Sequence, residues 1–594
     1  MPRPLCLSLS PDLSQQLEVH TKETLSRIIK ANANSQYAQT TPELSGFRAA
    51  LVGVDANIDD RLLEAFRHVH FTSYESYAPF FARFMNQPCR QAAVDNLFAP
   101  GLPAYLTASS STSGGASKIF ARYDHAEATG PQKQPDLARR SAVAKGTTAF
   151  IWYLGYRLVH VTDEKDNLIK KITYSSGTVA SRRNDLALHP DGDKDIMATI
   201  LPGQTAPYAA AFINNWRSFL VVHGLFAVVN KPVETMTMAF INTLVDMIRY
   251  VDDEFDMLIS CIETGVFPDL EGIAHLRCHL ETNFPANPER AAELRTIGRP
   301  SVCPGWCGLV WPHLRKVVAI ASGMFAASVP QAQRFLGPNI EIHARGYAAS
   351  EGWIGSPYDP LNLNQFKVTR KEIIEFLDVS REESISSVIP AWEVEVGKRY
   401  EIVMTTRDGL WRYRIGDVIE VCGFDPSDGS PIISFVERRN VAVRFADFVT
   451  TEKQLTDAIL SVAPRTIGQV LEFTVIVDSR VLPPTYGYFV ELVSETGPCL
   501  QYLMFINHLH VVTYYCYPSR MPCRAGFSAD ARNSHRNCKF RKPSINIVQP
   551  GTFREFRQRK LETGGSSLGQ IKIPVVLTDE ASIEWILTKV VKEL

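Results

Sequence analysis

The sequence predicts an α/β protein, with a large N-terminal domain of β-sheets flanked by helices and a small α+β domain at its C-terminus. Strand-like apolar runs that end in small-residue turns alternate with helical segments, which is typical of an α/β core. Beyond Asn440 the pattern changes to one short helix followed by alternating strands. We therefore expect a large domain over 1–437, a hinge over 438–450 and a small domain over 451–594.

The composition excludes several classes of protein. The 594 residues include 62 basic and 63 acidic side chains, and the net charge of −1 argues against a nucleic-acid binder. With 45% hydrophobic residues, disorder along most of the chain is excluded. No run approaches the ~18 apolar residues of a membrane span, and the N-terminus does not read as a signal peptide. The 11 cysteines are scattered and odd in number, so we expect reduced thiols in a cytoplasmic protein.

Helical segments are expected in three regions. The first ~100 residues read as helices and loops. Between Pro232 and Thr264 apolar residues recur every three or four positions, which predicts one long helix that begins at Pro232 and stops at Gly265. A last amphipathic helix is expected from Thr578 to Leu594.

Two local signals are specific. Alternating residues on both sides of Asp408-Gly409 predict a hairpin with a two-residue turn, whose second strand begins at Leu410. Thr451-Glu-Lys-Gln454 predicts a capping box that opens the helix of the small domain. No element is assigned to 496–524, which is rich in Cys, Tyr, His and Pro without either period.

The segment Ser109-Ser-Ser-Thr-Ser-Gly-Gly-Ala-Ser-Lys118 has the composition of a phosphate-binding loop. Hydroxyl groups and glycine amides converge well on anionic oxygens, and a lysine is near. The segment is not a Walker motif, because it lacks Gly-Lys-Ser/Thr. A flexible Ser/Gly linker would have the same composition. The rival string 174–181 lacks the paired glycine and the lysine, so we rank it second.

Two carboxylates occupy positions that suit ligand binding. Glu351 lies in a small-residue turn after a predicted strand, where α/β proteins place ligand-binding groups, and it could bind Mg²⁺. Asp417 ends the predicted hairpin, and its two oxygens could accept both hydroxyls of a ribose. Taken singly, each also fits a loop carboxylate without a function.

In this order along the chain, the segments resemble the adenylate-forming superfamily and, more narrowly, the auxin-responsive Gretchen Hagen family of acyl-acid amido synthetases. The phosphate-binding motif is matched by 109–115, the Tyr-Ala-Ser-Ser-Glu type motif by 347–351, and the third motif by 409–417. The adenine-side turn is matched by 321–324, the interdomain hinge by 435–440, and the closing segment by 569–574.

The resemblance implies an enzyme that uses ATP and Mg²⁺ to adenylate a small carboxylic acid, and then passes the acyl group to the amine of an amino acid. It implies that the small C-terminal domain is a mobile lid carrying the catalytic Lys572. Glu351 would be catalytic and would place Mg²⁺, and Met324 would contact the acid. The residues implied to bind ATP are Ser109, Ser110, Thr112, Ser113, Gly114, Gly115, Ser322, Gly323, Tyr347, Ser350, Asp417 and Arg438.

The chain departs from the family pattern at Ser111, where a glycine is usual, and at Ala349, where a serine is usual. Two other functions stay open: a ligase that forms a coenzyme A thioester, and a nucleotide-binding protein without turnover. The partners expected are a small acid and an amino acid, with no nucleic acid and no membrane, and the protein is expected to be a monomer. The sequence indicates neither the acid nor the acceptor, and no residue is identified as the base for the amine.

Overall fold

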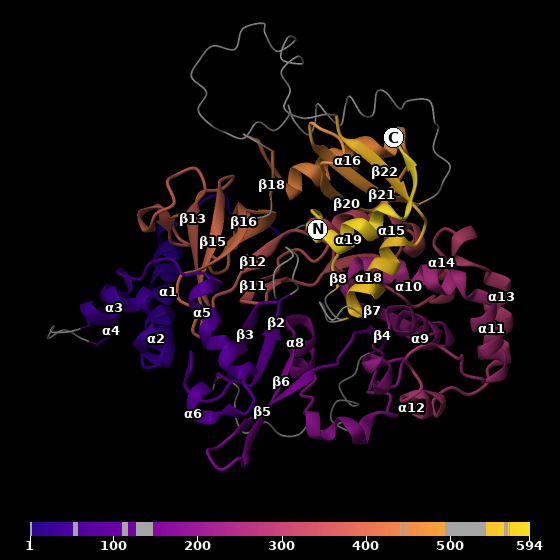
Figure 1. Ribbon diagram of the computed structural model, residues 1–594, viewed down its shortest axis with the longest axis horizontal. Coiled ribbons are helices and arrows are strands. Elements are labelled where there is room, and N and C mark those ends of the chain that lie inside the picture. The colour runs from indigo at the N-terminus through magenta and orange to yellow at the C-terminus, as the bar shows by residue number, and fades with distance from the viewer. Residues whose placement is uncertain are drawn as a thin grey trace, which may run out of the picture.

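The computed structural model describes residues 3–51, 58–109, 117–125, 146–439, 442–445, 448–493, 542–562, 568 and 571–594. The predicted phosphate loop from Ser110 to Gly115, including Ser111, lies outside the described residues, as does all of 496–524. Helices and sheets alternate through the N-terminal three quarters of the chain. The C-terminal elements, orange to yellow in Figure 1, lie against its parallel-sheet half.

A parallel sheet of four strands, in the order β4-β7-β8-β9, forms the core of that half. Its strands are β4 (Thr147–Ile151), β7 (Val233–Phe240), β8 (Lys316–Ile320) and β9 (Glu341–Ala344). The helices that pack on it or on one another include α9 (Trp216–Val229), α10 (Ile241–Asp253), α11 (Phe255–Thr264) and α15 (Val329–Leu336). Their apolar side chains form one continuous core with the strands. The α/β class is thus confirmed, and β8 and β9 are two of the strand-like runs that the sequence indicates.

The single helix expected from Pro232 to Thr264 is wrong in its first part, and its remainder is two helices, α10 and α11, that are separated at Glu254. Residues Val233–Phe240 form β7, which pairs in parallel with β4 and β8. The spacing of Met236 and Phe240 fits a helix, but Val-Glu-Thr-Met-Thr-Met also alternates, and the sheet on both sides favours a strand. The helical stripe is confirmed over α10 and α11, and Gly265 ends α11 in the left-handed conformation.

The other half of the N-terminal region contains two further sheets. The antiparallel sheet comprises β10 (Tyr347–Ala349), β11 (Gly352–Pro357), β12 (Phe366–Val368), β17 (Pro431–Arg438), β16 (Tyr413–Phe424), β15 (Arg399–Thr405), β13 (Ile373–Asp378) and β14 (Val388–Ile389). The mixed sheet comprises β1 (Cys89–Arg90), β5 (Arg157–Thr162), β6 (Leu168–Ser176), β2 (Tyr105–Ala108) and β3 (Ile119–Arg122), and β6 leads into α8 (Gly177–Asp185).

Helices near the N-terminus close this half of the molecule. They include α1 (Pro11–Asn32), α3 (Ser45–Ala50), α4 (Ile58–Phe66) and α5 (Tyr74–Phe81). Buried residues of these helices share a core with both sheets, in which Phe47 and Phe66 lie against Trp411. The helical reading of the first ~100 residues is therefore confirmed in outline.

The predicted hairpin joins β15 and β16, but its second strand begins at Tyr413 and not at Leu410. Gly409 has a φ of +88°, and a Cβ atom on it would lie 2.3 Å from the carbonyl oxygen of Phe98. Arg412 also has a positive φ, +41°, so the backbone does not enter the ladder before Tyr413. The turn is longer than two residues because it packs against the segment that contains Phe98.

The C-terminal part is a four-stranded sheet with helices. Its elements are β18 (Ala442–Phe445), β19 (Phe448–Thr451), α16 (Glu452–Thr466), β20 (Val470–Asp478), β21 (Thr485–Leu492), β22 (Ser544–Val548), α18 (Thr552–Glu562), α19 (Glu580–Leu587) and β23 (Val590–Glu593). The capping box is confirmed, since the Thr451 and Gln454 side chains each accept a backbone N–H of the other residue.

The last helix is shorter than expected. Helix α19 ends at Leu587, and residues Val590–Glu593 form β23, which pairs antiparallel with β22. A strand suits the β-branched pair Val590-Val591, and the neighbouring edge of β22 supplies the backbone partners.

Helix α18 packs on the parallel-sheet half. Nη1 of Arg557 donates to Oδ2 of Asp246 at 2.8 Å, and Nη2 of the same guanidinium contacts Glu472. Arg249 donates to the buried carboxylate of Glu491 at 2.9 Å. Charged groups that are largely buried therefore join the C-terminal part to α10.

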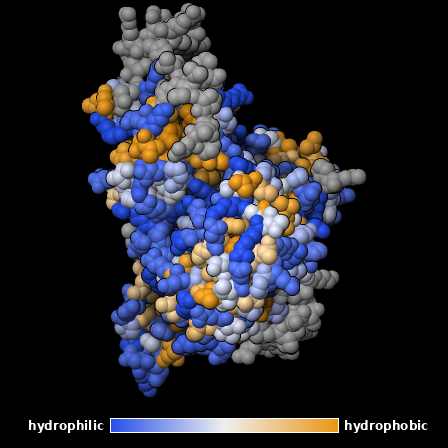
Figure 2. Space-filling model, turned by 90° about the vertical axis from the view of Figure 1, so that its right-hand side faces the viewer, coloured by the Kyte–Doolittle hydropathy of each residue, from blue (hydrophilic) through white to orange (hydrophobic). Residues whose placement is uncertain are grey.

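The side of the molecule that lies to the right in Figure 1 is mainly hydrophilic. Its apolar side chains occur in separate groups (Figure 2). Among the described helices, none has the length and hydropathy needed to cross a bilayer.

Candidate functional site

The carboxyl ends of β7 and β8 form one wall of the candidate site. β8 is followed by the turn that contains Ser322 and Gly323, and Gly323 has a φ of +59°, which favours glycine. A Cβ atom on Gly323 would lie 3.4 Å from the ring of Phe435. Phe240, at the end of β7, stacks on Phe325 with ring centroids 4.3 Å apart. This edge of a parallel sheet is where α/β proteins bind ligands.

A cavity of about 850 Å³ lies against this turn. Its lining includes Ser322, Gly323, Asp359, Asn362 and Asn364. Its volume is within the range of small-molecule sites. The cavity therefore has room for a nucleoside. Its wall combines polar side chains with the apolar residues that begin α15.

Asn364 fixes one side of this cavity. Its side-chain amide donates to the carbonyl of Phe435 at 2.9 Å and accepts from the backbone N–H of Phe435 at 3.1 Å. Phe435 in turn lies edge-on to Tyr347, with ring centroids 6.0 Å apart. The sequence gives no signal for Asn364, because its partner is a backbone far along the chain.

Asp417 accepts hydrogen bonds from two of the predicted nucleotide contacts. The hydroxyl of Tyr347 donates to Oδ2 at 2.8 Å, and Nε of Arg438 donates to Oδ1 at 2.7 Å. Asp417 and Arg438 are directly opposite each other on β16 and β17, and Asp417 is only 4% exposed. The structure therefore brings together three residues that the sequence places far apart.

Burial and charge set the protonation of this group. Burial raises the pKa of Tyr347, and the charge of Asp417 acts in the same direction, so the phenol stays a hydrogen-bond donor. Asp417 raises the pKa of Arg438, which keeps the guanidinium charged.

Glu351 lies near this group, in the turn between β10 and β11. Burial raises the pKa of its carboxyl group, while the positive charges of Arg438 and Lys118 oppose the shift. No three metal-ligating side chains cluster in the part of the chain that the structure describes. A lone carboxylate fits Mg²⁺, which binds through one or two carboxylates together with substrate phosphates and water.

Ser350 connects the site to the mixed sheet. Its carbonyl oxygen accepts from Thr107 of β2 at 3.3 Å and from the guanidinium of Arg122. Gly177, the first residue of α8, lies so close that a Cβ atom on it would be 4.0 Å from the Cα of Ser350.

The two candidate phosphate strings meet beside Ser350. Ala108, which precedes Ser109, pairs in register with Ser176, so the string 174–181 and the start of the Ser109 loop are neighbours. Ser109 pairs with Lys118 through its backbone and side chain, which closes the base of the loop. The rest of the loop, including Ser110, Thr112, Ser113, Gly114 and Gly115, lies outside the described residues.

Lys572 reaches this site from the C-terminal part of the chain. Its Nζ lies 5.1 Å from the ring centroid of Phe240 and 5.6 Å from that of Phe325. Burial and the charge of Arg438 lower the pKa of the ammonium to about 8, whereas Asp417 and Glu452 act to raise it. Met324 packs against both the parallel-sheet core and the core of the C-terminal sheet, so it lies where the two meet.

Glu452 is a charged residue near the site that the sequence reasoning missed. It is the first residue of α16, and burial raises the pKa of its carboxyl group to about 7, against the charges of Arg438 and Lys572. Its place beside the capping box and next to the predicted hinge was the available signal, but the box alone accounts for an acidic residue there.

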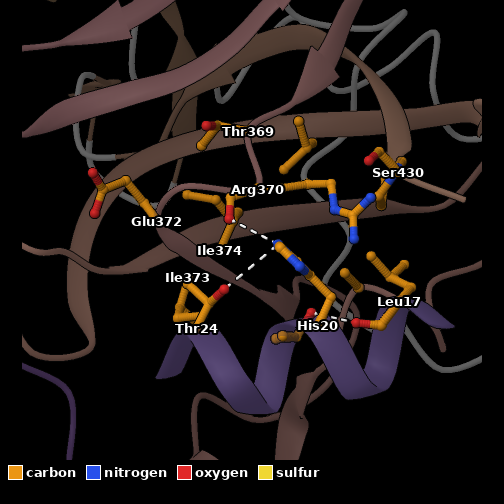
Figure 3. A pocket seen from close by; sticks show the side chains of 13 residues that line it. Leu17, His20, Thr24, Thr369, Arg370, Glu372, Ile373, Ile374 and Ser430 are labelled. Carbon is orange, nitrogen blue, oxygen red and sulfur yellow. Dashed lines mark hydrogen bonds between the residues drawn. The ribbon is translucent and has the colours of Figure 1, made fainter. Parts of the chain in front are cut away.

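A second cavity lies elsewhere, between α1 and the antiparallel sheet (Figure 3). His20 on α1 faces Arg370 across it, with Nε2 of His20 3.2 Å from the Arg370 carbonyl oxygen. Its volume of about 30 Å³ has room only for water, so it is not a nucleotide site.

Comparison with known proteins gives matches along nearly the whole chain. The model of the GH3 family N-terminal domain matches residues 10–341, that of the GH3 family central domain matches 367–438, and that of the GH3 family C-terminal domain matches 453–581.

Several curated relatives are similar to the chain. Indole-3-acetic acid-amido synthetase GH3.15 of Arabidopsis thaliana is 23% identical, over 99% of this chain and 95% of its own length. Jasmonoyl–L-amino acid synthetase GH3.5 of Oryza sativa subsp. japonica is 25% identical, over 93% and 91%. The putative indole-3-acetic acid-amido synthetase GH3.9 of Arabidopsis thaliana is 27% identical over 56% of this chain and 58% of its own length.

A solved structure has the same fold. AtGH3.15 acyl acid amido synthetase in complex with 2,4-DB superposes with a TM-score of 0.73 at 20% identity, covering 98% of this chain and 95% of that one. The α/β architecture with a separate C-terminal part is thereby confirmed.

Proposed function

The chain belongs to the GH3 family, and on that premise we propose that it is an ATP-dependent ligase that adenylates a small carboxylic acid and transfers the acyl group to the amine of an amino acid. The amido synthetase names of full-length relatives support this activity. The observation that carries the proposal is the convergence of Lys572 with Tyr347, Asp417 and Arg438 beside the cavity at Ser322-Gly323.

In the first step a carboxylate oxygen of the acid attacks the α-phosphorus of ATP, and the bond to pyrophosphate breaks. The product is an acyl-adenylate, in which AMP is a good leaving group. We propose that Asp417 accepts hydrogen bonds from the ribose hydroxyls, since its carboxylate oxygens can accept more hydrogen bonds than those from Tyr347 and Arg438. The cavity beside Gly323 would hold the adenine, next to Tyr347 and Phe435. Lys572 would then place a positive charge near the α-phosphate.

The phosphates of ATP are assigned to the loop that begins at Ser109. The start of α8 beside it adds backbone N–H groups and the positive end of a helix dipole. Glu351 would hold Mg²⁺ together with phosphate oxygens, and the ion would neutralise the charge that develops on pyrophosphate.

In the second step the neutral amine of an amino acid attacks the acyl carbonyl carbon, AMP leaves with the electron pair of the broken C–O bond, and the nitrogen releases one proton. For this step we propose that 451–594 moves as a lid about a hinge at 438–450. Arg438 at the end of β17 contacts Asp417, so motion of the hinge would change the contacts of Asp417 at the ribose site. Cytoplasmic location and a monomeric state stay predictions.

The test is acid-dependent release of pyrophosphate from ATP and Mg²⁺, screened over aromatic, jasmonate-like and aliphatic acids. Amino acids and coenzyme A are supplied in separate arms, and products are identified by mass spectrometry. Pyrophosphate release with an amide product supports the proposal, whereas a thioester product replaces it by the coenzyme A ligase. Nucleotide binding without pyrophosphate release under any acid would overturn both, and would leave a binding protein.

A further inference from the structure

Two arginine side chains meet on one indole ring at the edge of the candidate site. Trp152 directly follows β4, Arg345 directly follows β9, and Arg182 is on α8. The guanidinium carbon of Arg345 lies 4.0 Å from the Trp152 ring centroid, and that of Arg182 lies 4.6 Å from it. Trp152 is 2% exposed, and its Nε1 donates to Thr237 at 3.3 Å, which fixes the ring.

These two cations have less counter-charge than their burial requires. Nη1 of Arg345 and Nε of Arg182 are buried atoms without a hydrogen-bond partner. Within the described part of the chain, Arg345 forms no ion pair. Arg182 forms one, with the half-exposed Asp185 at 3.4 Å. Burial lowers the pKa of Arg345 to about 9, and the charge of Arg182 adds to the effect.

Packing on tryptophan accounts for one arginine at this place, but not for two. A cation over an indole face is stabilised by the ring, yet two like charges in a partly desolvated site repel. Removing charges from water is costly unless opposite charge or hydrogen bonds offset it. An anion between the guanidinium groups would supply both, and the planar fork of arginine matches a carboxylate.

The position of the pair favours a substrate group over a structural ion. Arg345 is two residues before Tyr347, whose hydroxyl contacts Asp417. Arg182 is on the helix whose first residue lies against Ser350. The pair is thus adjacent to the predicted nucleotide contacts, at the edge of the sheet where ligands bind.

We propose that Arg182 and Arg345 bind a substrate carboxylate against the face of Trp152. That the carboxylate belongs to a substrate rests on the ligase function proposed above. Two sources share this chemistry: the α-carboxylate of the acceptor amino acid, and a second carboxylate on the acid that is adenylated.

The test uses the full chain with Arg345→Gln and Arg182→Gln, and with Arg299→Gln as the matched control. The Arg299 guanidinium also lies over a ring, that of Phe255 at 5.5 Å, but it is paired with Asp256 at 2.6 Å. Two reactions are measured: ATP–pyrophosphate exchange, which needs the acid alone, and amide formation, which needs the amino acid as well.

If the acceptor binds here, each site variant raises the KM for the amino acid by about tenfold or more and leaves the KM for the acid in the exchange reaction unchanged. If the acid binds here, the KM for a dicarboxylic acid in the exchange reaction rises by a similar factor, and that for its monocarboxylic analogue does not. Arg345→Lys keeps the charge without the fork, so it should recover part of the loss. Folded site variants that change neither KM would overturn the proposal.

A binding measurement separates this proposal from the ligase function. Tryptophan fluorescence of the unchanged protein is titrated with succinate and with L-glutamate, and Trp152→Phe identifies the signal of this indole. If no acid supports pyrophosphate exchange, the ligase function fails, and the titration decides the carboxylate site. A saturable response that is lost in Arg345→Gln supports the site, and no response to either probe overturns it.

Discussion

Arg557 on α18 and Asp246 on α10 form an ion pair between Nη1 and Oδ2 at 2.8 Å, with both side chains almost completely inaccessible to water. The same guanidinium contacts Glu472 on β20, and Asp246 also accepts from Nε1 of Trp216 at 3.2 Å. The C-terminal sheet is therefore joined to the parallel-sheet half through a buried charge cluster, and not only through apolar contact.

Arg557→Ala should lower the free energy of unfolding by about 3–5 kcal/mol, because it leaves the buried carboxylate of Asp246 without its charge partner. Urea denaturation followed by circular dichroism measures the change. Arg67→Ala, which removes an exposed pair with Glu64, is the control and should change stability by less than about 0.5 kcal/mol. Equal effects of the two substitutions would show that the buried pair contributes no more than a surface pair.

Asp417→Ala should weaken ATP binding by about 10–100-fold, since the ribose hydroxyls lose a charged acceptor and Arg438 loses its partner. Isothermal titration calorimetry with ATP and Mg²⁺ gives the dissociation constant. Asp191→Ala, at an exposed carboxylate paired with Lys171, should leave it unchanged. An unaltered nucleotide affinity in Asp417→Ala would remove this residue from the nucleotide site.

Lys572→Ala should lower kcat of pyrophosphate exchange far more than it raises the KM values for ATP and acid. Its charge would act on the transition state of adenylation and contribute little to ground-state binding. Steady-state kinetics of the exchange reaction separate the two constants. Parallel losses in kcat and in affinity would instead indicate a role in substrate binding.

The rate of adenylation should fall as the pH rises through about 8, because burial lowers the pKa of Lys572 to about 8 and the neutral amine carries no charge for the α-phosphate. Below that pH the ammonium is protonated and the rate should be level with respect to this group. Lys572→Arg keeps its charge at every pH used, so the decline should disappear in its pH–rate profile. A decline that persists in Lys572→Arg belongs to another group.

Gly409→Ala should destabilise the protein by at least about 3 kcal/mol. The residue has a φ of +88°, and the new Cβ atom would lie 2.3 Å from the Phe98 carbonyl oxygen. Gly397→Ala is matched in φ, +80°, but has nothing within 4 Å of the new atom, so it should cost only about 1 kcal/mol. Thermal and urea unfolding of the two variants isolate the steric contribution, which would be absent if both lost the same stability.

Local patterns predicted much of the fold. The capping box of α16, the stop at Gly265 and the strand-like runs that became β8 and β9 depend on residues close in sequence, and these predictions are confirmed. The predictions for 233–240 and 590–593 were wrong because neighbouring strands, which no local pattern reveals, favour extended backbone there.

The candidate site was predictable wherever a motif ends a strand. Glu351 was found in this way. Asp417 was found from its place in the predicted hairpin, but it lies inside β16, which continues to Phe424, and not at the end of the hairpin. The structure places both carboxylates near Arg438. Asn364 and the pair Arg182 and Arg345 carry no local signature, since each acquires its neighbours only through long-range folding. Glu452 lies beside the capping box, but the box by itself accounts for an acidic residue there.

Glu491, near the end of β21, forms hydrogen bonds with two helices, α18 and α10. Its oxygens accept the backbone N–H groups of Gly551 at 2.8 Å and Phe553 at 3.1 Å, where α18 begins, and the guanidinium of Arg249 at 2.9 Å. If the contact with α10 were broken, both amides would still bind this carboxylate. The first turn of α18 would therefore keep these hydrogen bonds if the C-terminal sheet separated from α10.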